Sequence, residues 1–220
     1  MQTKKFTTIV GGNRKEIMAT YFISDLHFHH KNILIYEPDR MAELVRYVAA
    51  NQDVDRMCLI LKVMYNGSPE DCDRVLEMHD QMLVDYWNEV VTDDDEVWFL
   101  GDLGFGSREY ISSLVAKLKG HKHMIYGNHD RFSVSCYESM GFETVSKKPV
   151  VLKERFMLSH APRPDMLKNS DIFYIFGHIH SKPHHEGEHE LATHGDNYQC
   201  VCVERQKYRP VKIVEFDEAQ

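Results

Sequence analysis

The chain has 220 residues, of which 43% are hydrophobic, so it is long enough for one domain with a full core and too short for two ordinary domains. Its formal net charge of −8 argues against a broad electrostatic surface for duplex DNA or anionic membrane, although a local basic patch is compatible with it. No segment approaches the apolar length of a membrane span, and the first twenty residues lack the hydrophobic core of a secretion signal. We therefore expect a single cytoplasmic domain.

The beginning of the chain allows two interpretations. Residues 1–18 are either an N-terminal appendage that precedes a second start at Met18, or a hairpin that turns at Gly11-Gly12-Asn13. Residues 19–220 are expected to form the domain itself. The five cysteines contain no C-x-x-C pair, which favours small reduced side chains in a reducing compartment.

From Ala19 onward, short apolar runs repeatedly end in polar side chains that can bind a metal ion. TYFI precedes SDLHFHH, VWFL precedes GDLGFG, HMIY precedes GNHD, RFML precedes SHAP, and IFYIF precedes GHIH. Short runs of β-forming residues bounded by glycine or polar residues are typical of buried strands. Because ligands bind at the carboxyl ends of strands in open α/β sheets, the five strand ends predict one shared site.

Helical patterns lie between the predicted strands. Two amphipathic stretches, residues 41–64 and 70–91, predict two helices, and Ser68 followed by Pro69 predicts where the second begins. Shorter helices are expected over residues 108–119 and 134–140, each followed by a glycine. Near the C-terminus, YQCVCVE and PVKIVEF predict two further strands. The alternation of strands and helices favours a layered α/β domain.

The side chains at the strand ends have the chemistry of a site for divalent cations. They offer carboxylate oxygens, imidazole nitrogens and an amide oxygen but no thiolate, which suits Mn²⁺, Fe²⁺, Zn²⁺ or a similar ion. Any one of them alone is more often a turn former or a cap, and it is the ordered set that indicates a metal site. Seven candidates are too many for one tetrahedral ion and suffice for two: Asp25, His27, Asp102, Asn128, His160, His178 and His180.

The ordered motifs resemble the signature of the calcineurin-like metallophosphoesterases, which is D-x-H, GD, GNH[DE], H and GHxH. The matching elements are DLH at Asp25, GD at Gly101, GNHD at Gly127, SH at Ser159 and GHIH at Gly177. The resemblance covers about residues 19–215 and is closest to the small prokaryotic and phage members. It implies a four-layer α/β/β/α fold, in which two sheets form a β-sandwich core flanked by helices. The chain departs from the family pattern at His29, where glycine is expected, and at about residues 41–91, where a helical insertion is longer than in compact members.

The resemblance also implies roles for individual residues. Asp25, His27 and His180 would hold one metal ion, Asn128, His160 and His178 the second, and Asp102 would bridge both. The expected cofactor is two divalent ions, Mn²⁺ first, with Fe²⁺, Zn²⁺, Ni²⁺ or Mg²⁺ as alternatives. A hydroxide shared by the ions would attack the phosphorus atom.

The histidine and aspartate that follow Asn128 have separate expected roles. His129 would protonate the leaving oxygen as a general acid. Asp130 would either orient His129 or form a salt bridge with Arg131.

Other polar residues near the motifs have two readings each. His30 and Arg131 are candidates for substrate binding, and His30 alternatively supports a metal ligand. Arg163 and Lys182 could hold a phosphate or be solvated loop charges, and His29 is expected to be exposed. A histidine-rich segment predicts a polar loop or a further metal site and contains His184, His185, His189 and His194.

These observations predict a metal-dependent phosphoesterase, a hydrolase that acts on a phosphodiester or phosphomonoester of a nucleotide or another small molecule. A nuclease acting on single-stranded ends is one alternative, which the acidic charge disfavours. A non-catalytic binding protein with the same fold is another. No membrane partner is expected, and the sequence leaves the oligomeric state open.

Overall fold

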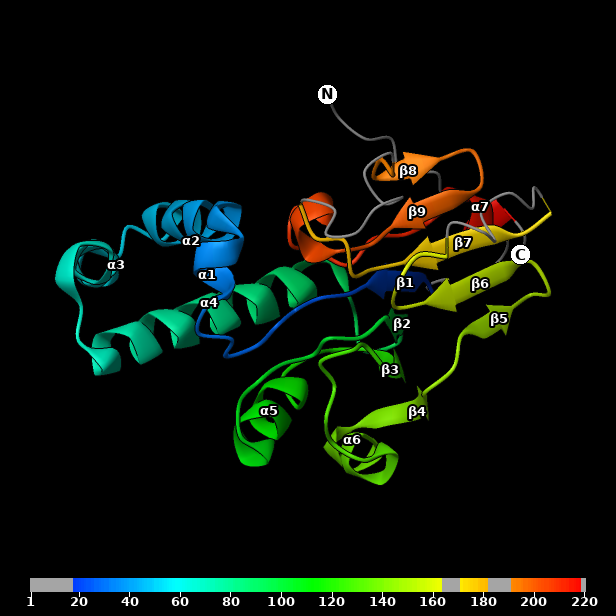
Figure 1. The fold of residues 1–220 in the computed structure, drawn as a ribbon, viewed down its shortest axis with the longest axis horizontal. Coiled ribbons are helices and arrows are strands. Elements are labelled where there is room, and N and C mark those ends of the chain that lie inside the picture. Colours follow the sequence, from blue (N-terminus) through cyan, green and yellow to red (C-terminus); the bar gives the residue numbers. More distant parts are fainter. Residues whose placement is uncertain (1–17, 164–170, 182–190, 219–220) are drawn as a thin grey trace, which may run out of the picture.

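The computed structural model describes residues 18–163, 171–181 and 191–218. Figure 1 shows two β-sheets on one side of the molecule, with helices packed around them and a group of helices extending to the other side. The predicted N-terminal hairpin lies outside the described residues, as do four of the polar loop candidates: Lys182, His184, His185 and His189. No helix in the described ranges is both long and apolar enough to cross a membrane.

The first sheet has four strands in the order β1-β2-β3-β4, and all of its neighbouring strands are parallel. Its strands are β1 (Thr20–Ile23), β2 (Glu96–Phe99), β3 (His121–Ile125) and β4 (Phe142–Ser146). Strand β1 is buried along its whole length, as expected of a strand whose two faces are both covered. The carboxyl ends of all four strands therefore meet at one edge of the sheet.

The second sheet has five strands in the order β5-β6-β7-β9-β8, of which β6, β7 and β9 are parallel. Its strands are β5 (Val150–Leu152), β6 (Phe156–Ser159), β7 (Phe173–Phe176), β8 (His194–Gly195) and β9 (Tyr198–Cys200). Phe22 and Leu100 from the first sheet pack with Phe156, Leu158 and Ile175 from the second in one buried cluster. The predicted two-sheet α/β fold with flanking helices is confirmed.

The segment after β1 forms four helices where the sequence predicted two. They are α1 (Ile33–Tyr36), α2 (Pro38–Ala50), α3 (Val54–Asn66) and α4 (Pro69–Val90). The predicted helix over residues 41–64 is broken because Gln52 has φ +54° and the Asp53 side chain caps α3 by accepting a hydrogen bond from Arg56 N at 3.0 Å. Helix α4 begins at the predicted cap, where Ser68 and Asp71 form a capping box.

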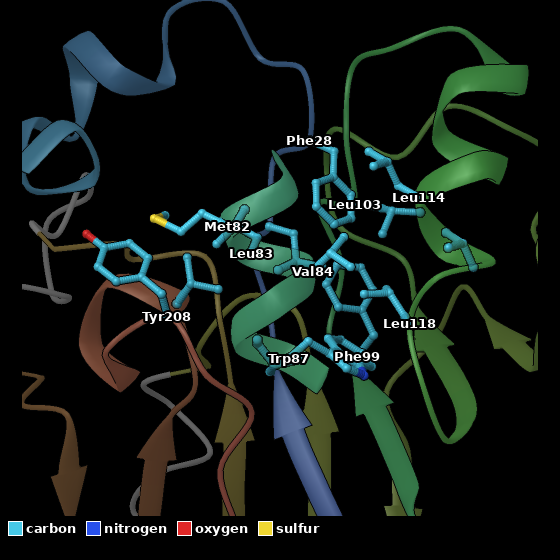
Figure 2. Packing of buried hydrophobic residues seen from close by; sticks show 14 of the residues in the cluster. Phe28, Met82, Leu83, Val84, Trp87, Phe99, Leu103, Leu114, Leu118 and Tyr208 are labelled. Atoms are coloured by element: carbon cyan, nitrogen blue, oxygen red, sulfur yellow. The ribbon is translucent and has the colours of Figure 1, made fainter. Parts of the chain in front are cut away.

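Helix α4 anchors the helical segment to the first sheet. Figure 2 shows Trp87 of α4 beside Phe99 of β2, and Leu83 of α4 and Leu114 of α5 (Arg108–Val115) belong to the same buried cluster. The Trp87 side chain is buried, and its Nε1 donates a hydrogen bond to Lys119 O at 3.0 Å. Apolar packing therefore holds this region, as the amphipathic pattern of the sequence indicates.

Two further segments test the sequence-based expectations. Helix α6 (Val134–Met140) ends at Gly141, which has φ +112°, as the predicted glycine cap requires. The predicted strand in PVKIVEF is wrong, because only Val211 bridges to Phe22, and α7 (Val214–Glu218) follows. A helical turn places Ile213 and Phe216, three residues apart, on one face against the core.

Candidate metal centre

The parallel strands bring the seven predicted ligands to one edge of the two sheets. Asp25 and His27 follow β1, Asp102 follows β2, Asn128 follows β3, His160 follows β6, and His178 and His180 follow β7. Three of these strands belong to the first sheet and two to the second. The carboxyl ends of neighbouring parallel strands form the usual crevice for ligands in such sheets.

One group of donors consists of Asp25, His27 and His180. Each residue offers one ligand atom, and these atoms all lie within 4.8 Å of one another. His27 Nε2 lies 3.8 Å from Asp25 Oδ1, and His180 Nε2 lies 3.6 Å from the same oxygen. Asp25 Oδ1 and both ring nitrogens of His27 are buried and have no hydrogen-bond partner among the described residues. Because an unpartnered buried polar atom is costly, these donors fit a bound cation.

A second group consists of Asp25, Asp102 and His160, whose ligand atoms also lie within 4.8 Å of one another. His160 Nε2 lies 2.9 Å from Asn128 Oδ1 and 3.2 Å from His178 Nδ1, so the remaining two predicted ligands adjoin this group. The structure thus brings all seven predicted ligands together.

Asp102 lies between the two predicted ligand sets. Its Oδ2 is 3.6 Å from His27 Nε2 and 3.4 Å from His160 Nε2. Asp25 is a member of both groups as well, which the sequence did not predict. Two carboxylates, rather than one, are therefore placed where two neighbouring cations could share them.

Five of the seven candidate ligands have a left-handed backbone. The φ angles are +61° at Asp25, +50° at His27, +60° at Asp102, +74° at His178 and +43° at His180. This region disfavours residues with a Cβ, and such conformations persist only where the surrounding structure enforces them. Their concentration in these loops supports a functional role for this edge.

Close backbone approach explains two of the glycines in the motifs. A Cβ added at Gly127 would overlap the Asp102 carboxylate, and one added at Gly177 would overlap the side chain of Ser24 and crowd that of Asp25. Glycine is therefore required there by the space that the ligands themselves occupy.

The carboxylates of the site are ionised. Burial opposes the charge of Asp25, but the neighbouring His27 and the charges of His180 and His160 outweigh burial and hold the pKa of this carboxyl well below its usual value. Burial likewise opposes the charge of Asp102, but the adjacent His160 ring, with Nε2 at 3.4 Å from Asp102 Oδ2, lowers its pKa. The centre therefore presents negative charge to a cation in a desolvated environment.

The buried ion pair between Arg40 and Glu204 supports the candidate ligand His180. No sequence pattern predicted this ion pair. Glu204 accepts a hydrogen bond at Oε1 from His180 Nδ1 at 3.0 Å and another from Arg40 Nε at 2.7 Å. Arg40, on α2, also donates to Asp25 O at 2.6 Å and to Leu26 O at 2.8 Å. Although burial opposes it, the charges of Arg40 and His180 lower the pKa of Glu204 to about 2. A carboxylate that binds the second nitrogen of a histidine fixes the tautomer and orientation of a metal ligand.

His129 and Asp130 occupy different surroundings. His129 N donates to Asp102 Oδ1 at 2.9 Å, and its exposed ring lies 5.3 Å from the Phe105 ring. Asp130 is turned toward the backbone, because its carboxylate accepts hydrogen bonds from Gly127 N at 2.7 Å and Asp102 N at 2.8 Å. It also accepts from Leu103 N at 3.0 Å and from the Tyr137 hydroxyl at 3.1 Å.

Asp130 therefore joins the loop after β2 to the loop after β3. The expected contacts of Asp130 with the His129 ring and with Arg131 are not among its hydrogen bonds or ion pairs in the described part of the chain. Arg131 instead donates to Phe105 O.

A cavity of about 400 Å³ opens beside the candidate ligands. Part of its lining consists of His30, Ile33, Tyr36 and Phe105, and we call this part of the cavity the aromatic pocket. The His30 ring stacks on Phe105 with centroids 4.2 Å apart. Burial, followed by the charges of His27 and His129, lowers the pKa of His30 to about 4, so this ring is neutral at pH 7 and can offer a hydrogen bond but no charge to a phosphate.

Two of the remaining candidates lie away from the ligands. His29 is half-buried rather than exposed, because its ring packs 4.8 Å from the Tyr110 ring and its N–H donates to the Asp80 carboxylate. Its φ of +54° explains why glycine is expected at this position. His194 is exposed and lies 3.6 Å from Glu215.

Comparisons with known proteins agree with this geometry. The family profile described as calcineurin-like phosphoesterase matches residues 18–214. An uncharacterized protein of Methanocaldococcus jannaschii is 28% identical over 198 residues, which cover 88% of this chain and 86% of that protein. The gene 66 protein of Mycobacterium phage L5 is 30% identical over 114 residues, which cover 50% of this chain and 39% of that protein.

A solved structure shares the fold. It is a protein of unknown function from Aquifex aeolicus, similar with a TM-score of 0.54 and 21% identity over 91% of this chain and 98% of that one.

Proposed function

Because the chain belongs to the calcineurin-like phosphoesterase family, as its motifs indicated, we propose that it is a two-metal-dependent phosphoesterase. The substrate is a phosphodiester or phosphomonoester of a nucleotide or another small molecule. The observation that carries this proposal is the pair of overlapping donor groups, which share Asp25 and include buried atoms that have no hydrogen-bond partner among the described residues.

The residues divide between two neighbouring cation positions. Asp25, His27 and His180 would hold one ion, and Asn128, His160 and His178 would hold the other, with the Asp102 carboxylate between the two sets. When bound, two divalent ions such as Mn²⁺ activate water at neutral pH and neutralise charge on the phosphoryl oxygens. Glu204 and Arg40 hold His180 and the backbone of Asp25 in place while the ester is bound.

His129 supplies the proton. Its backbone is fixed by the bond to Asp102, and its ring faces the cavity beside the candidate ligands. In this position the ring can donate a proton to the oxygen that leaves the phosphorus atom. Phe105 and the neutral His30 form a wall that an aromatic or heterocyclic substituent of the ester can contact.

The test is hydrolysis of bis(p-nitrophenyl) phosphate by protein loaded with Mn²⁺, with a chelator as control. Asp102→Asn removes a carboxylate that adjoins both ligand sets, so both metal content and hydrolysis should fall. His129→Gln should lower turnover by about 10²- to 10⁴-fold while metal content stays unchanged. Chelator-insensitive hydrolysis, or an equal loss of metal in both variants, would contradict the proposal.

A further inference from the structure

The loops after β3, β4 and β6 gather cations beside the candidate metal centre. Strands β3 and β4 are parallel and pair Ile125 with Ser146 at their carboxyl ends. Lys147 and Lys148, which directly follow β4, therefore lie beside the loop that carries Asn128. The Ser146 side chain fixes this turn by accepting a hydrogen bond from Lys148 N at 3.1 Å and donating one to Lys148 O at 2.8 Å.

These cations and two candidate ligands line one cavity of about 350 Å³, which we call the basic pocket. Its walls include Tyr126, Asn128, Lys147, Lys148, His160 and Arg163. Asn128 also lines the cavity that contains the aromatic pocket. The two cavities thus meet at a residue of the candidate metal centre, with rings on one side and positive charge on the other.

The positive charge of the basic pocket is not neutralised within the described ranges. No carboxylate lines the pocket, and the ion pairs of the described lysines and arginines involve other residues. The only described interaction of the Lys147 ammonium is with the Tyr126 ring, whose centroid lies 5.1 Å away. In a chain with a formal net charge of −8, three such cations beside one cavity fit an anionic ligand.

We propose that the basic pocket binds a second phosphate group of the substrate, next to the phosphate that is held at the metal ligands. This inference rests on the proposed function and narrows its substrate class. The substrate then carries a ring-containing group toward the aromatic pocket and a further phosphate toward Lys147, Lys148 and Arg163. Arginine binds phosphate through two parallel N–H groups and lysine binds it as a point charge, so the three side chains suit this group. Short oligonucleotides and nucleotide polyphosphates share this chemistry.

Competition between nucleotides and a generic substrate tests the pocket directly. Hydrolysis of bis(p-nitrophenyl) phosphate, which has one phosphate, is measured at a constant excess of Mn²⁺ in the presence of three inhibitors. These are thymidine 5′-monophosphate, thymidine 3′,5′-bisphosphate and thymidine 5′-triphosphate. At least one inhibitor with more than one phosphate should bind about tenfold more tightly than the monophosphate. A gain for the bisphosphate assigns the pocket to a nucleotide chain, and a gain for the triphosphate alone assigns it to a polyphosphate.

The preference for an additional phosphate is measured as the inhibition constant of the monophosphate divided by that of the tighter-binding bisphosphate or triphosphate. The variant Lys147→Gln/Lys148→Gln should bring this ratio close to one. Arg163→Gln should reduce this ratio by a smaller factor, and higher salt should reduce it in the unmodified protein. The matched control is Lys117→Gln/Lys119→Gln, which removes the same charge before β3 begins, at the opposite edge of the sheet, and should leave the ratio unchanged.

A ratio near one in the unmodified protein, or a ratio that the pocket variant leaves unchanged, overturns the inference. Failure of the proposed function is a separate result, because it is seen as absence of hydrolysis with every metal. In that case calorimetric titration of the same three nucleotides into Mn²⁺-loaded protein decides whether the basic pocket prefers the additional phosphate.

Discussion

The edge of the sheets that carries the candidate ligands and the helices α2 to α4 are stabilised in different ways. At the edge, buried charges lie within a few ångströms of one another, five candidate ligands have left-handed backbone, and some donors lack a partner among the described residues. The helices are stabilised by apolar packing and by ordinary caps such as Ser68. Changes in the helices should therefore lower stability alone, whereas changes at the edge should also alter metal binding. Arg40 is the exception, because it lies on α2 and reaches the edge.

The largest effect is expected from Arg40→Met, which leaves Glu204 as an uncompensated buried charge. Removing one partner of a buried ion pair typically costs about 3–5 kcal/mol of stability. Metal affinity should fall about ten- to hundredfold, because His180 and the backbone of Asp25 lose their support. Denaturant unfolding in chelator measures the first effect and calorimetric metal titration the second. Arg46→Met, exposed on the same helix, is the control, and unchanged metal affinity in Arg40→Met would refute the supporting role.

Leu83→Ala should lower stability without changing the metal affinity of the folded protein. Leu83 is buried on α4 in the same core cluster as Phe99 of the first sheet, as Figure 2 shows, and such a truncation costs about 2–5 kcal/mol. Leu61→Ala on α3 serves as the matched control, because Leu61 is 58% exposed and its truncation should change stability by less than about 0.5 kcal/mol. The contrast between the two regions breaks down if Leu83→Ala weakens metal binding as strongly as Arg40→Met does.

A smaller effect is expected from His79, which is buried on α4 with no hydrogen-bond partner for either ring nitrogen among the described residues. Burial chiefly, with the nearby charge of Arg40, lowers its pKa, although Asp80 at 3.4 Å and Glu204 act in the opposite direction. Below the unfolded pKa of about 6.5, the unfolded chain binds a proton that the folded protein does not. Stability should therefore fall with pH below 6.5, by at most about 1.4 kcal/mol per pH unit.

His79→Leu should remove this component. Unfolding free energies of the two proteins measured between about pH 7.5 and about pH 5.5 should diverge as the pH falls. His121→Gln is a control with the opposite sign, because the hydrogen bond to Glu143 raises the pKa of His121. Parallel pH profiles for His79→Leu and the unmodified protein would show that His79 does not titrate as inferred.

The order of motifs along the chain was sufficient to predict which ligands gather, because each follows an apolar run and parallel strands align their ends. The start of α4 at Ser68 and the end of α6 at Gly141 could also be predicted, since each depends on neighbouring residues alone. Arg40 and Glu204 are 164 positions apart, and nothing local marks an arginine on an amphipathic helix as buried. The role of Asp130 depends likewise on backbone groups of another loop.

The secondary structure that the sequence analysis missed has similar causes. Strand β4 has an exposed middle, so its apolar residues do not form a run. The break between α2 and α3 depends on a single left-handed residue, Gln52, within a continuous amphipathic pattern. In the PVKIVEF segment the apolar residues fit both the period of two of a strand and the three-residue spacing of a helix. The helix is favoured by the packing of Phe216 against Phe22 and Phe156, which are distant in the sequence.

The candidate ligands come from both sheets, with Asp25, Asp102 and Asn128 on one layer and His160, His178 and His180 on the other. Sliding of one layer over the other would change every distance across this seam. Cations bound between the two layers would cross-link them and resist this sliding. The same contacts that shape the reaction geometry would then lock the sandwich against mechanical slippage at its open end.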